Sequence, residues 1–204
     1  RRALWAPHFE RVKTADGVQT QSYYVQRLRV YPHALRARNA YYSPQKKALL
    51  LGYFTGSETG HKGDEQTVFT ALSSDIIAHE TTHALLDGLH RRFREPTNDD
   101  VLAFHEAFAD IVALFQHFSL DGALRDALRQ QIAKERNDFT QESLLSGIAI
   151  QFGKGMGQHG ALRSFVGKQP SPKDYSGSAE AHARGSVLVA AVFDAFLQIY
   201  KRKS

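Results

Sequence analysis

The pattern of hydrophobic and polar positions divides the chain into a strand-rich first part and a helical remainder. Short aromatic or apolar runs separated by Gly, Asp, Ser and Lys predict strands over 22–30, 48–54 and 67–72. The polar, glycine-bearing stretch 56–64 predicts a loop between the last two strands. Strands followed by helices in separate blocks are typical of the α+β class, which is therefore the expected fold class.

From residue 73 onward, apolar residues recur with a helical period. The Ser-Ser-Asp cluster at 73–75 predicts the start of a helix that must end before Pro96. Later helices are predicted over 99–118, 121–135, 141–152 and 179–200. The chain shows neither an internal repeat nor a clear linker. We therefore expect one domain over 1–204, with a strand-rich lobe over about 1–90 and a helical lobe over about 97–204.

The composition is that of a globular protein. The 204 residues are 42% hydrophobic and 23% charged, and such a length can bury a sizeable core. No apolar run approaches the roughly 20 residues that span a bilayer, so we expect no membrane span. Because the chain begins without Met and stops just after an apolar helical pattern, we expect a fragment trimmed at both ends. Its compartment, secreted or cytoplasmic, and its oligomeric state stay open.

Two features of the composition narrow the chemistry. The absence of cysteine excludes disulfides, thiolate metal sites and a cysteine nucleophile, so His, Asp or Glu must hold any metal. The net charge is +5, which raises the question of a nucleic-acid partner. The basic residues are scattered, however, whereas a nucleic-acid binder usually concentrates them on one face. Nucleic acid is therefore not the expected partner.

A His-Glu-Thr-Thr-His sequence at 79–83 lies in the middle of the first strong helix. Residues four apart share a helix face, so both imidazoles can reach one ion, and Glu80 can stand beside that ion without binding it. Two surface histidines with an incidental glutamate are the alternative interpretation. The apolar neighbours of the motif favour a buried helix, and burying these groups without a partner costs on the order of several kcal/mol. A metal ion removes that cost.

A catalytic zinc site has three protein ligands and one open position. Glu106 lies in the next predicted helix, 106 − 83 = 23 residues after His83, which suits a helix end, a turn and an antiparallel return. Asp87 and Asp110 each follow a predicted ligand by one helical turn, where partners of the ligating imidazoles are wanted. The sequence therefore predicts one zinc ion held by His79, His83 and Glu106.

These segments resemble the thermolysin-like metallopeptidases, the gluzincin group whose metal is held by two histidines and a glutamate. The family's helix reads H-E-x-x-H-A-x-x-D, and 79–87 reads HETTHALLD. Its E-A-x-x-D segment is matched by EAFAD at 106–110, and its Asn-Ala-aromatic-aromatic edge strand by NAYY at 39–42. The resemblance covers roughly 18–120 well and the rest loosely.

The resemblance implies a zinc-dependent endopeptidase in which a metal-activated water attacks the peptide bond. The implied roles are zinc ligands His79, His83 and Glu106, general base Glu80, and orienting partners Asp87 and Asp110. It further implies that Asn39, Ala40 and Tyr42 bind an extended peptide or protein substrate at the sheet edge. The implied fold is an antiparallel or mixed sheet lobe whose edge strand lies over the active-site helix. A zinc cleft would separate it from a mainly helical lobe.

The family also uses a downstream histidine to stabilise the tetrahedral oxyanion. His182 precedes a late apolar helix and fits that place, with His159 of the glycine-rich loop as the competing candidate. A polar residue on the first turn of a helix is the alternative interpretation of His182. At the position of the family's catalytic tyrosine the chain has Arg94, and Tyr53 and Tyr175 are the candidate replacements.

Other departures from the family concern metal and specificity. No acidic calcium-binding clusters are visible, so no structural calcium is expected. Arg163 and Arg184 are the candidates for the arginine beside the family's primed-side pocket, and the preferred cleavage site stays open. The remaining histidines are interpreted as structural or surface residues, although His90 and His105 lie nearest the predicted site.

Two other functions compete with an endopeptidase. An aminopeptidase-like gluzincin needs an acidic anchor for the free amine, and no such motif lies nearby. A catalytically silent zinc fold that acts as a binding module does not need Glu80, whose presence therefore favours catalysis.

Overall fold

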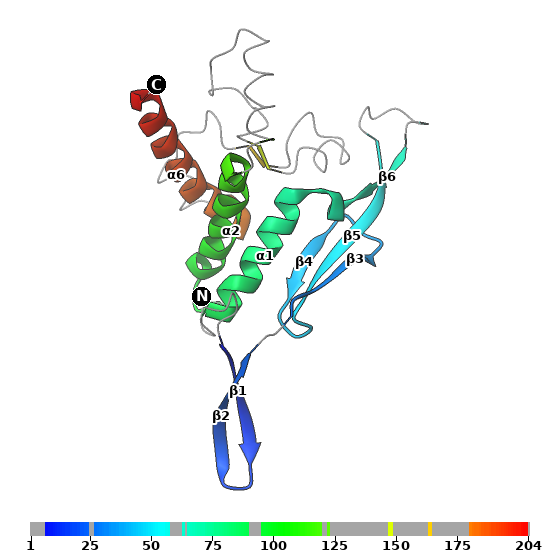
Figure 1. Cartoon of the computed structure of the whole chain (residues 1–204), viewed down its shortest axis with the longest axis vertical. Coiled ribbons are helices and arrows are strands. Elements are labelled where there is room, and N and C mark those ends of the chain that lie inside the picture. The colour runs from blue at the N-terminus through cyan, green and yellow to red at the C-terminus, as the bar shows by residue number, and fades with distance from the viewer. Residues whose placement is uncertain are drawn as a thin grey trace.

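The computed structural model describes residues 7–24, 27–57, 63, 65–89, 95–119, 122, 147–148, 163–164 and 180–203. Within these residues it combines small sheets with three helices, which confirms the α+β class (Figure 1). The strands are β1 (Pro7–Thr14), β2 (Gly17–Tyr24), β3 (Arg29–Leu35), β4 (Ala40–Ser43), β5 (Ala48–Gly56), β6 (Gln66–Phe69), β7 (Gly147–Ile148) and β8 (Arg163–Ser164). The helices are α1 (Ser74–Leu89), α2 (Asp99–Ser119) and α6 (Ala181–Lys203), with a 3-10 turn, η1 (Thr70–Leu72), before α1.

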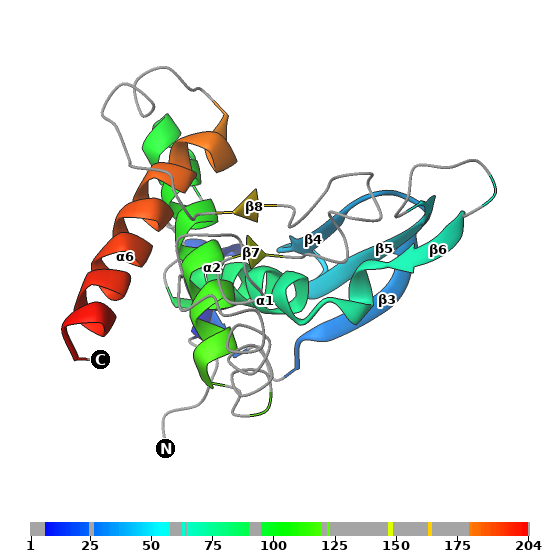
Figure 2. The ribbon, with the colours of Figure 1, turned by 90° about the horizontal axis from the view of Figure 1, so that it is seen from above.

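The central strand of the main sheet is β5, whose ALLL run is almost wholly buried. It pairs with β3 in parallel, with β4 antiparallel at Ala48–Leu51, and with β6 antiparallel at Tyr53–Gly56. The strand order β3-β5-β4 leaves β4 at one edge of the described sheet. That short edge strand contacts α1 (Figure 2).

Gly52 fixes where β4 begins. Its N–H donates to the carbonyl oxygen of Asn39 at 3.0 Å. A Cβ at this position would collide with the carbonyl oxygens of Ala37 and Asn39, so a larger residue would push the chain before β4 away from β5. The close crossing therefore sets the position of Asn39 and of the edge strand that follows it.

Helix α1 lies between the sheet and the other helices. It packs against β4 and β5 on one side and against α2 on the other, and α6 packs against α2 (Figure 2). The hydrophobic core joins these layers, and its buried members are Leu49, Leu51, Phe54, Ile76, Ala107, Ala113, Leu114, Val189 and Phe193. Because both sides of α1 are covered, polar residues on either side of this helix are taken out of water and need partners.

The contact between α2 and α6 is close at the beginning of α6. A Cβ on Gly185 would lie 2.6 Å from the carbonyl oxygen of Ala103 and 3.1 Å from the amide nitrogen of Ala107. The guanidinium of Arg184 pairs with the Asp100 carboxylate at 2.6 Å next to this contact. Small residues and the Arg184–Asp100 ion pair therefore contribute to holding the first turns of α6 against α2.

Three sequence-based expectations need correction. The single strand over 22–30 is wrong, because β2 ends at Tyr24 and β3 begins at Arg29. Its first residues belong instead to the β1–β2 hairpin, whose turn carries Gly17 with a φ of 122°. The predicted strand over 67–72 ends at Phe69, where the turn η1 takes over. The helix over 141–152 is wrong at Gly147–Ile148, which pair with β8, since local periodicity carries no information about a distant pairing partner.

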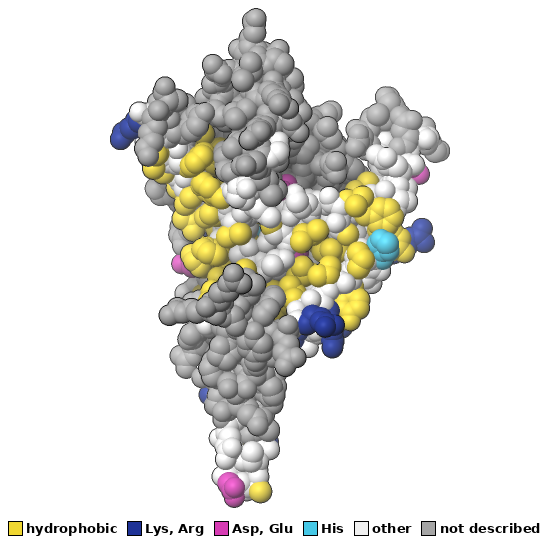
Figure 3. Space-filling view, in the orientation of Figure 1, with side chains coloured by type: hydrophobic (Ala, Val, Ile, Leu, Met, Phe, Trp, Pro, Cys, Tyr) yellow, Lys and Arg dark blue, Asp and Glu magenta, His cyan; other side chains and the backbone are white. Residues whose placement is uncertain are grey.

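Other predicted segments lie outside the described residues, including the helix over 121–135 apart from residue 122. Helix α6 is long and apolar enough over Ala181–Ile199 to cross a membrane by length and composition alone. Hydrophobic side chains are visible in the region of this helix in Figure 3, and Leu188 and Ile199 of this helix are exposed. Its other face packs on α2 through the buried Val189 and Phe193, as a core helix does. That no segment spans a membrane remains a prediction.

Candidate metal centre

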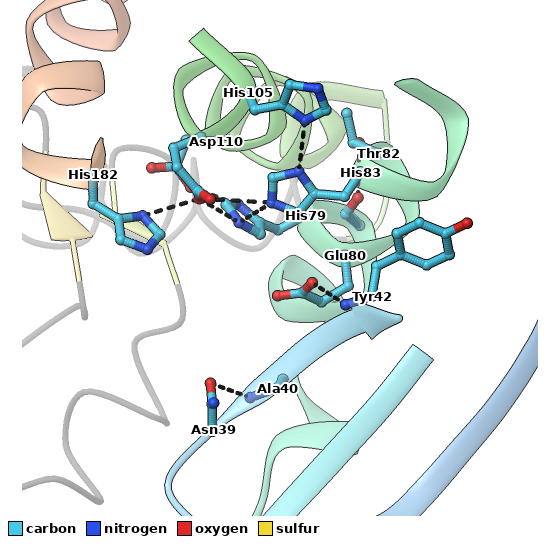
Figure 4. A network of polar contacts seen from close by, with 12 residues as sticks. Asn39, Ala40, Tyr42, His79, Glu80, Thr82, His83, His105, Asp110 and His182 are labelled. Carbon is cyan, nitrogen blue, oxygen red and sulfur yellow. Dashed lines mark hydrogen bonds and ion pairs between the residues drawn. The ribbon is translucent and has the colours of Figure 1, made fainter. Parts of the chain in front are cut away.

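The three predicted ligands lie together, His79 and His83 on α1 and Glu106 on α2. Figure 4 shows the two imidazoles side by side. His79 Nε2 lies 3.1 Å from His83 Nε2 and 3.2 Å from Glu106 Oε2, and His83 Nε2 lies 3.6 Å from that oxygen. Zinc bonds of about 2.0–2.1 Å at tetrahedral angles place ligand atoms roughly 3.3 Å apart. The observed triangle has this size, so the three residues can hold one metal ion.

The surroundings of Glu106 Oε2 also fit a cation. This oxygen is buried and meets no donor with hydrogen-bond geometry. Yet three imidazole nitrogens lie close to it, those of His79, of His83 and, at 3.0 Å, of His182. Burial alone would raise the pKa of Glu106, but these imidazoles hold it well below its usual range. A positive ion between the carboxylate and the imidazoles would give the buried Glu106 oxygen the partner that hydrogen bonds do not supply.

The partner of His79 is Asp110, which is buried on α2. The His79 Nδ1 atom lies 2.7 Å from Asp110 Oδ1, which is where the resemblance implied an orienting carboxylate. Burial alone would lower the pKa of His79, but the carboxylates of Asp110 and Glu106 outweigh this effect and raise the pKa to about 9. A carboxylate at Nδ1 keeps a proton on that atom, so the Nε2 lone pair of the neutral ring is directed at the centre.

The partner of His83 differs from the one implied. Its Nδ1 atom lies 3.4 Å from Nδ1 of His105, whereas Asp87 accepts a hydrogen bond of 2.8 Å from the hydroxyl of Tyr42. The reason lies in helix geometry. Asp87 follows Glu80 by seven residues, nearly two turns, and so shares the face of α1 that meets β4. The sequence predicts a structural or surface role for His105 but also places it near the site, and its position directly before a ligand is the signal for a closer role.

Glu80 is buried between β4 and the two imidazoles. Its Oε2 atom accepts a hydrogen bond of 2.8 Å from the backbone N–H of Tyr42. Burial raises the pKa of Glu80, and the nearby His79 and His83 offset part of this effect. A carboxylate with a raised pKa next to a metal centre is suited to taking up and releasing a proton.

The edge strand presents its outer backbone groups to this region. Because Asn39 O accepts from Gly52 N, alternation directs the backbone groups of Asn39 and Tyr41 toward β5 and those of Ala40 and Tyr42 outward. The N–H of Ala40 donates to Asn39 Oδ1 at 2.9 Å, and that of Tyr42 donates to Glu80. The three predicted substrate-binding residues therefore line the open edge of the sheet beside Glu80.

His182 reaches the centre from the first turn of α6. The carboxylate of Glu180 caps this turn by accepting from the backbone N–H groups of His182 and Ala183 at 3.0 and 2.7 Å. The His182 side chain is 44% exposed, and its Nδ1 atom lies 3.0 Å from Glu106 Oε2. A partly exposed imidazole beside the ligands can meet both the centre and a bound molecule.

The other candidates fall elsewhere. Tyr53 packs with the rings of His33 and Phe69 at centroid distances of 5.9 and 5.8 Å. Arg184 pairs with Asp100, as described above. The candidates that lie outside the described residues are His90, Arg94, His159 and Tyr175, and the side chain of Arg163 is not described.

Comparisons with known proteins add no family to this geometry. No protein-family model, no curated protein and no solved structure matches the chain. The resemblance to the gluzincins therefore remains a prediction from the motif residues.

Proposed function

We propose that the chain is a zinc-dependent endopeptidase. The observation that carries the proposal is the triangle of His79, His83 and Glu106 with the buried carboxylate of Glu80 beside it. Two imidazoles and one carboxylate are a common ligand set of catalytic zinc, and the chain has no thiol that would favour another site type. When bound, the ion would polarise a substrate carbonyl and lower the pKa of water.

Glu80 is the general base in this proposal. With its pKa raised by burial, it accepts a proton from the attacking water and delivers it to the departing amine. The hydrogen bond from Tyr42 N–H holds its Oε2 atom, so the carboxylate has a defined orientation. Loss of the charge at this position removes the proton acceptor but none of the three metal ligands.

The edge strand β4 receives the substrate. An extended peptide that donates to the outward carbonyl oxygens of Ala40 and Tyr42 passes next to Glu80, while the Tyr42 N–H stays bonded to Glu80. The side chain of Asn39, whose Oδ1 atom accepts from the Ala40 N–H, can bind the peptide in addition to this backbone pairing. Backbone pairing reads little side-chain identity, so it suits an enzyme that cuts within unstructured chains.

His182 donates a hydrogen bond to the oxyanion. Its place at the N-terminus of α6 and its distance of 3.0 Å from a ligand oxygen support this role. A positioned oxyanion donor contributes about 2.7–4 kcal/mol to catalysis.

The test is hydrolysis of casein by the zinc-loaded protein, with mass spectrometry of the products. The wild type is compared with Glu80→Gln, and the zinc content of both is measured. We expect internal cleavage by the wild type and none by the variant, with equal zinc in both. Zinc-bound wild type that cuts nothing would contradict the proposal and favour a silent binding module. Products trimmed only from their N-termini would indicate an aminopeptidase.

A further inference from the structure

The two ligating imidazoles are held by different partners. His79 has the carboxylate of Asp110, and His83 has a second imidazole, that of His105. We infer that His105 is the positioning residue of His83: it accepts a hydrogen bond from His83 Nδ1 and so directs the Nε2 lone pair at the metal. The inference rests on the metal centre of the proposed function, but it needs no catalytic activity.

The orientation of the two rings supports a hydrogen bond rather than a stacking contact. Their centroids are 5.6 Å apart with an interplanar angle of 16°, whereas the two Nδ1 atoms are 3.4 Å apart. The difference, 5.6 − 3.4 = 2.2 Å, is close to the sum of the two ring radii. Both nitrogens therefore lie near the line between the centroids, and the N–H of one ring points in its own plane at the lone pair of the other.

The tautomers follow from the position of the metal centre. A neutral imidazole has one N–H donor and one lone pair. If His83 Nε2 gives its lone pair to a metal, the proton of His83 is on Nδ1, which must then donate. Nδ1 of His105 is the acceptor, and the proton of His105 is on Nε2. One contact between α1 and α2 thus fixes both the rotation and the tautomer of a ligand.

Among the described residues, helix α2 provides the partners of both ligand histidines. It supplies the third ligand, Glu106, and the partner of His79, Asp110, four residues apart on one face. The buried His105, directly before Glu106, supplies the partner of His83. The two partners differ in charge and distance, 2.7 Å to a carboxylate and 3.4 Å to an imidazole. A neutral acceptor binds more weakly than a charged one, so His83 is the less firmly held ligand.

The test is the zinc dissociation constant, measured by competition with a chromogenic chelator at fixed pH. His105→Leu removes the acceptor at similar volume, and His105→Asn keeps an acceptor oxygen. Loss of an orienting partner typically weakens metal binding by roughly 10–100-fold. We expect that loss in the Leu variant and recovery of most of the affinity in the Asn variant. The control is His33→Leu, an exposed histidine on β3, which should bind zinc like the wild type.

Two results would overturn the inference. One is wild-type zinc affinity in His105→Leu, and the other is an Asn variant as weak as the Leu variant, which would point to packing alone. A second measurement covers the case in which the Leu variant does not fold. Long-range proton–nitrogen NMR spectra of the zinc-loaded wild type should show His83 protonated at Nδ1 and His105 at Nε2. A proton on Nδ1 of His105 would refute the inference without any variant.

The outcomes also separate this inference from the proposed function. If the wild type binds no zinc, the metal centre fails and both fall. If it binds zinc and His105→Leu binds equally well, only the role of His105 falls. If the role of His105 holds and casein is not cut, the centre is a metal site without the proposed catalysis.

Discussion

The two sides of α1 are built with different chemistry. On the side of α2, His79 and His83 meet Glu106, with Asp110 behind His79. On the side of β4, carboxylates two turns apart meet one tyrosine: Glu80 accepts from the N–H of Tyr42, and Asp87 from its hydroxyl. Both sides bury ionisable groups, but on the α2 side the ligand atoms of three of them, His79, His83 and Glu106, lie close together.

Because of this difference, the α2 side is suited to binding a metal ion and the β4 side to holding the edge strand in position. The α2 side leaves a buried carboxylate oxygen without a well-oriented donor among several imidazole nitrogens, and it can therefore hold a cation. On the β4 side, one oxygen of each carboxylate is paired with a neutral donor, the N–H or the hydroxyl of Tyr42. Changes on the α2 side should alter metal affinity, and changes on the β4 side should alter how firmly the edge strand is held.

The largest expected effect is that of Glu106→Gln. The substitution keeps the shape of the side chain and removes the charge that faces the imidazoles. Zinc affinity should fall by more than the roughly 10–100-fold typical of an outer partner, because a ligand itself is impaired. Chelator competition measures this loss. Glu180→Gln, a carboxylate at the start of α6, is the matched control and should bind zinc normally. Normal binding by Glu106→Gln would exclude the proposed centre.

The next effect concerns pH and protein prepared without metal. Because the folded-state pKa of His79 is about 9, above the ordinary histidine value of 6.5, the folded state binds more protons between these values. The free energy of unfolding should therefore be highest below pH 6.5 and fall as the pH rises toward 9. The loss is on the order of 3 kcal/mol, since one pKa unit corresponds to about 1.4 kcal/mol.

Urea denaturation at several pH values measures this dependence. Asp110→Asn removes a main cause of the raised pKa and should flatten the curve between pH 6.5 and 9. The same variant should weaken zinc binding by roughly 10–100-fold. An unchanged pH dependence in Asp110→Asn would show that another group carries it.

Tyr42→Phe tests the β4 side. It deletes the hydroxyl that donates to the buried Asp87 and leaves the backbone bond to Glu80 in place. The free energy of unfolding should fall by about 1–3 kcal/mol, with zinc affinity unchanged. Tyr41→Phe, the exposed neighbour on the same strand, is the control and should be neutral. A loss of zinc affinity in Tyr42→Phe would break the separation between the two sides of α1.

The smallest effect is expected at the Arg184–Asp100 pair. The Asp100 side chain is 55% exposed, so solvent screens the interaction. Asp100→Asn should cost less than about 1 kcal/mol and leave zinc binding as it is. Thermal denaturation at low and high salt checks this value, because a screened pair should weaken further in salt.

The sequence predicted the parts of this centre that depend on helical spacing. His79 and His83 share a face because they are four residues apart, as are Glu106 and Asp110, and the structure places both pairs as expected. The partner of His83 did not follow from spacing, because it depends on how α2 is rotated against α1. The same rotation buries Ala103 and Ala107.

The rotation of α2 against α1 also leaves Phe104 and Phe108 partly exposed, which their apolar character alone does not predict. The edge strand shows a similar limit. Asn39 and Tyr42 were selected by resemblance, but the bond from the Tyr42 hydroxyl to Asp87 joins residues 45 apart in sequence. Such a contact depends on how the sheet lies on α1, which no local pattern records. The β1–β2 hairpin is different, since its Asp16-Gly17 turn is a local signal from which the sequence alone predicts a hairpin.

The tight contact at Gly185 lies close to the N-terminal end of α6 and far from its C-terminal end. At 1.5 Å per residue, His182 lies about 4.5 Å from this contact, and the C-terminal end of the helix about 27 Å from it. A rigid tilt about this contact would therefore move the far end roughly six times as far as His182. In such a tilt, a displacement of several ångströms at the C-terminal end of α6 would shift the backbone of His182 by less than about one.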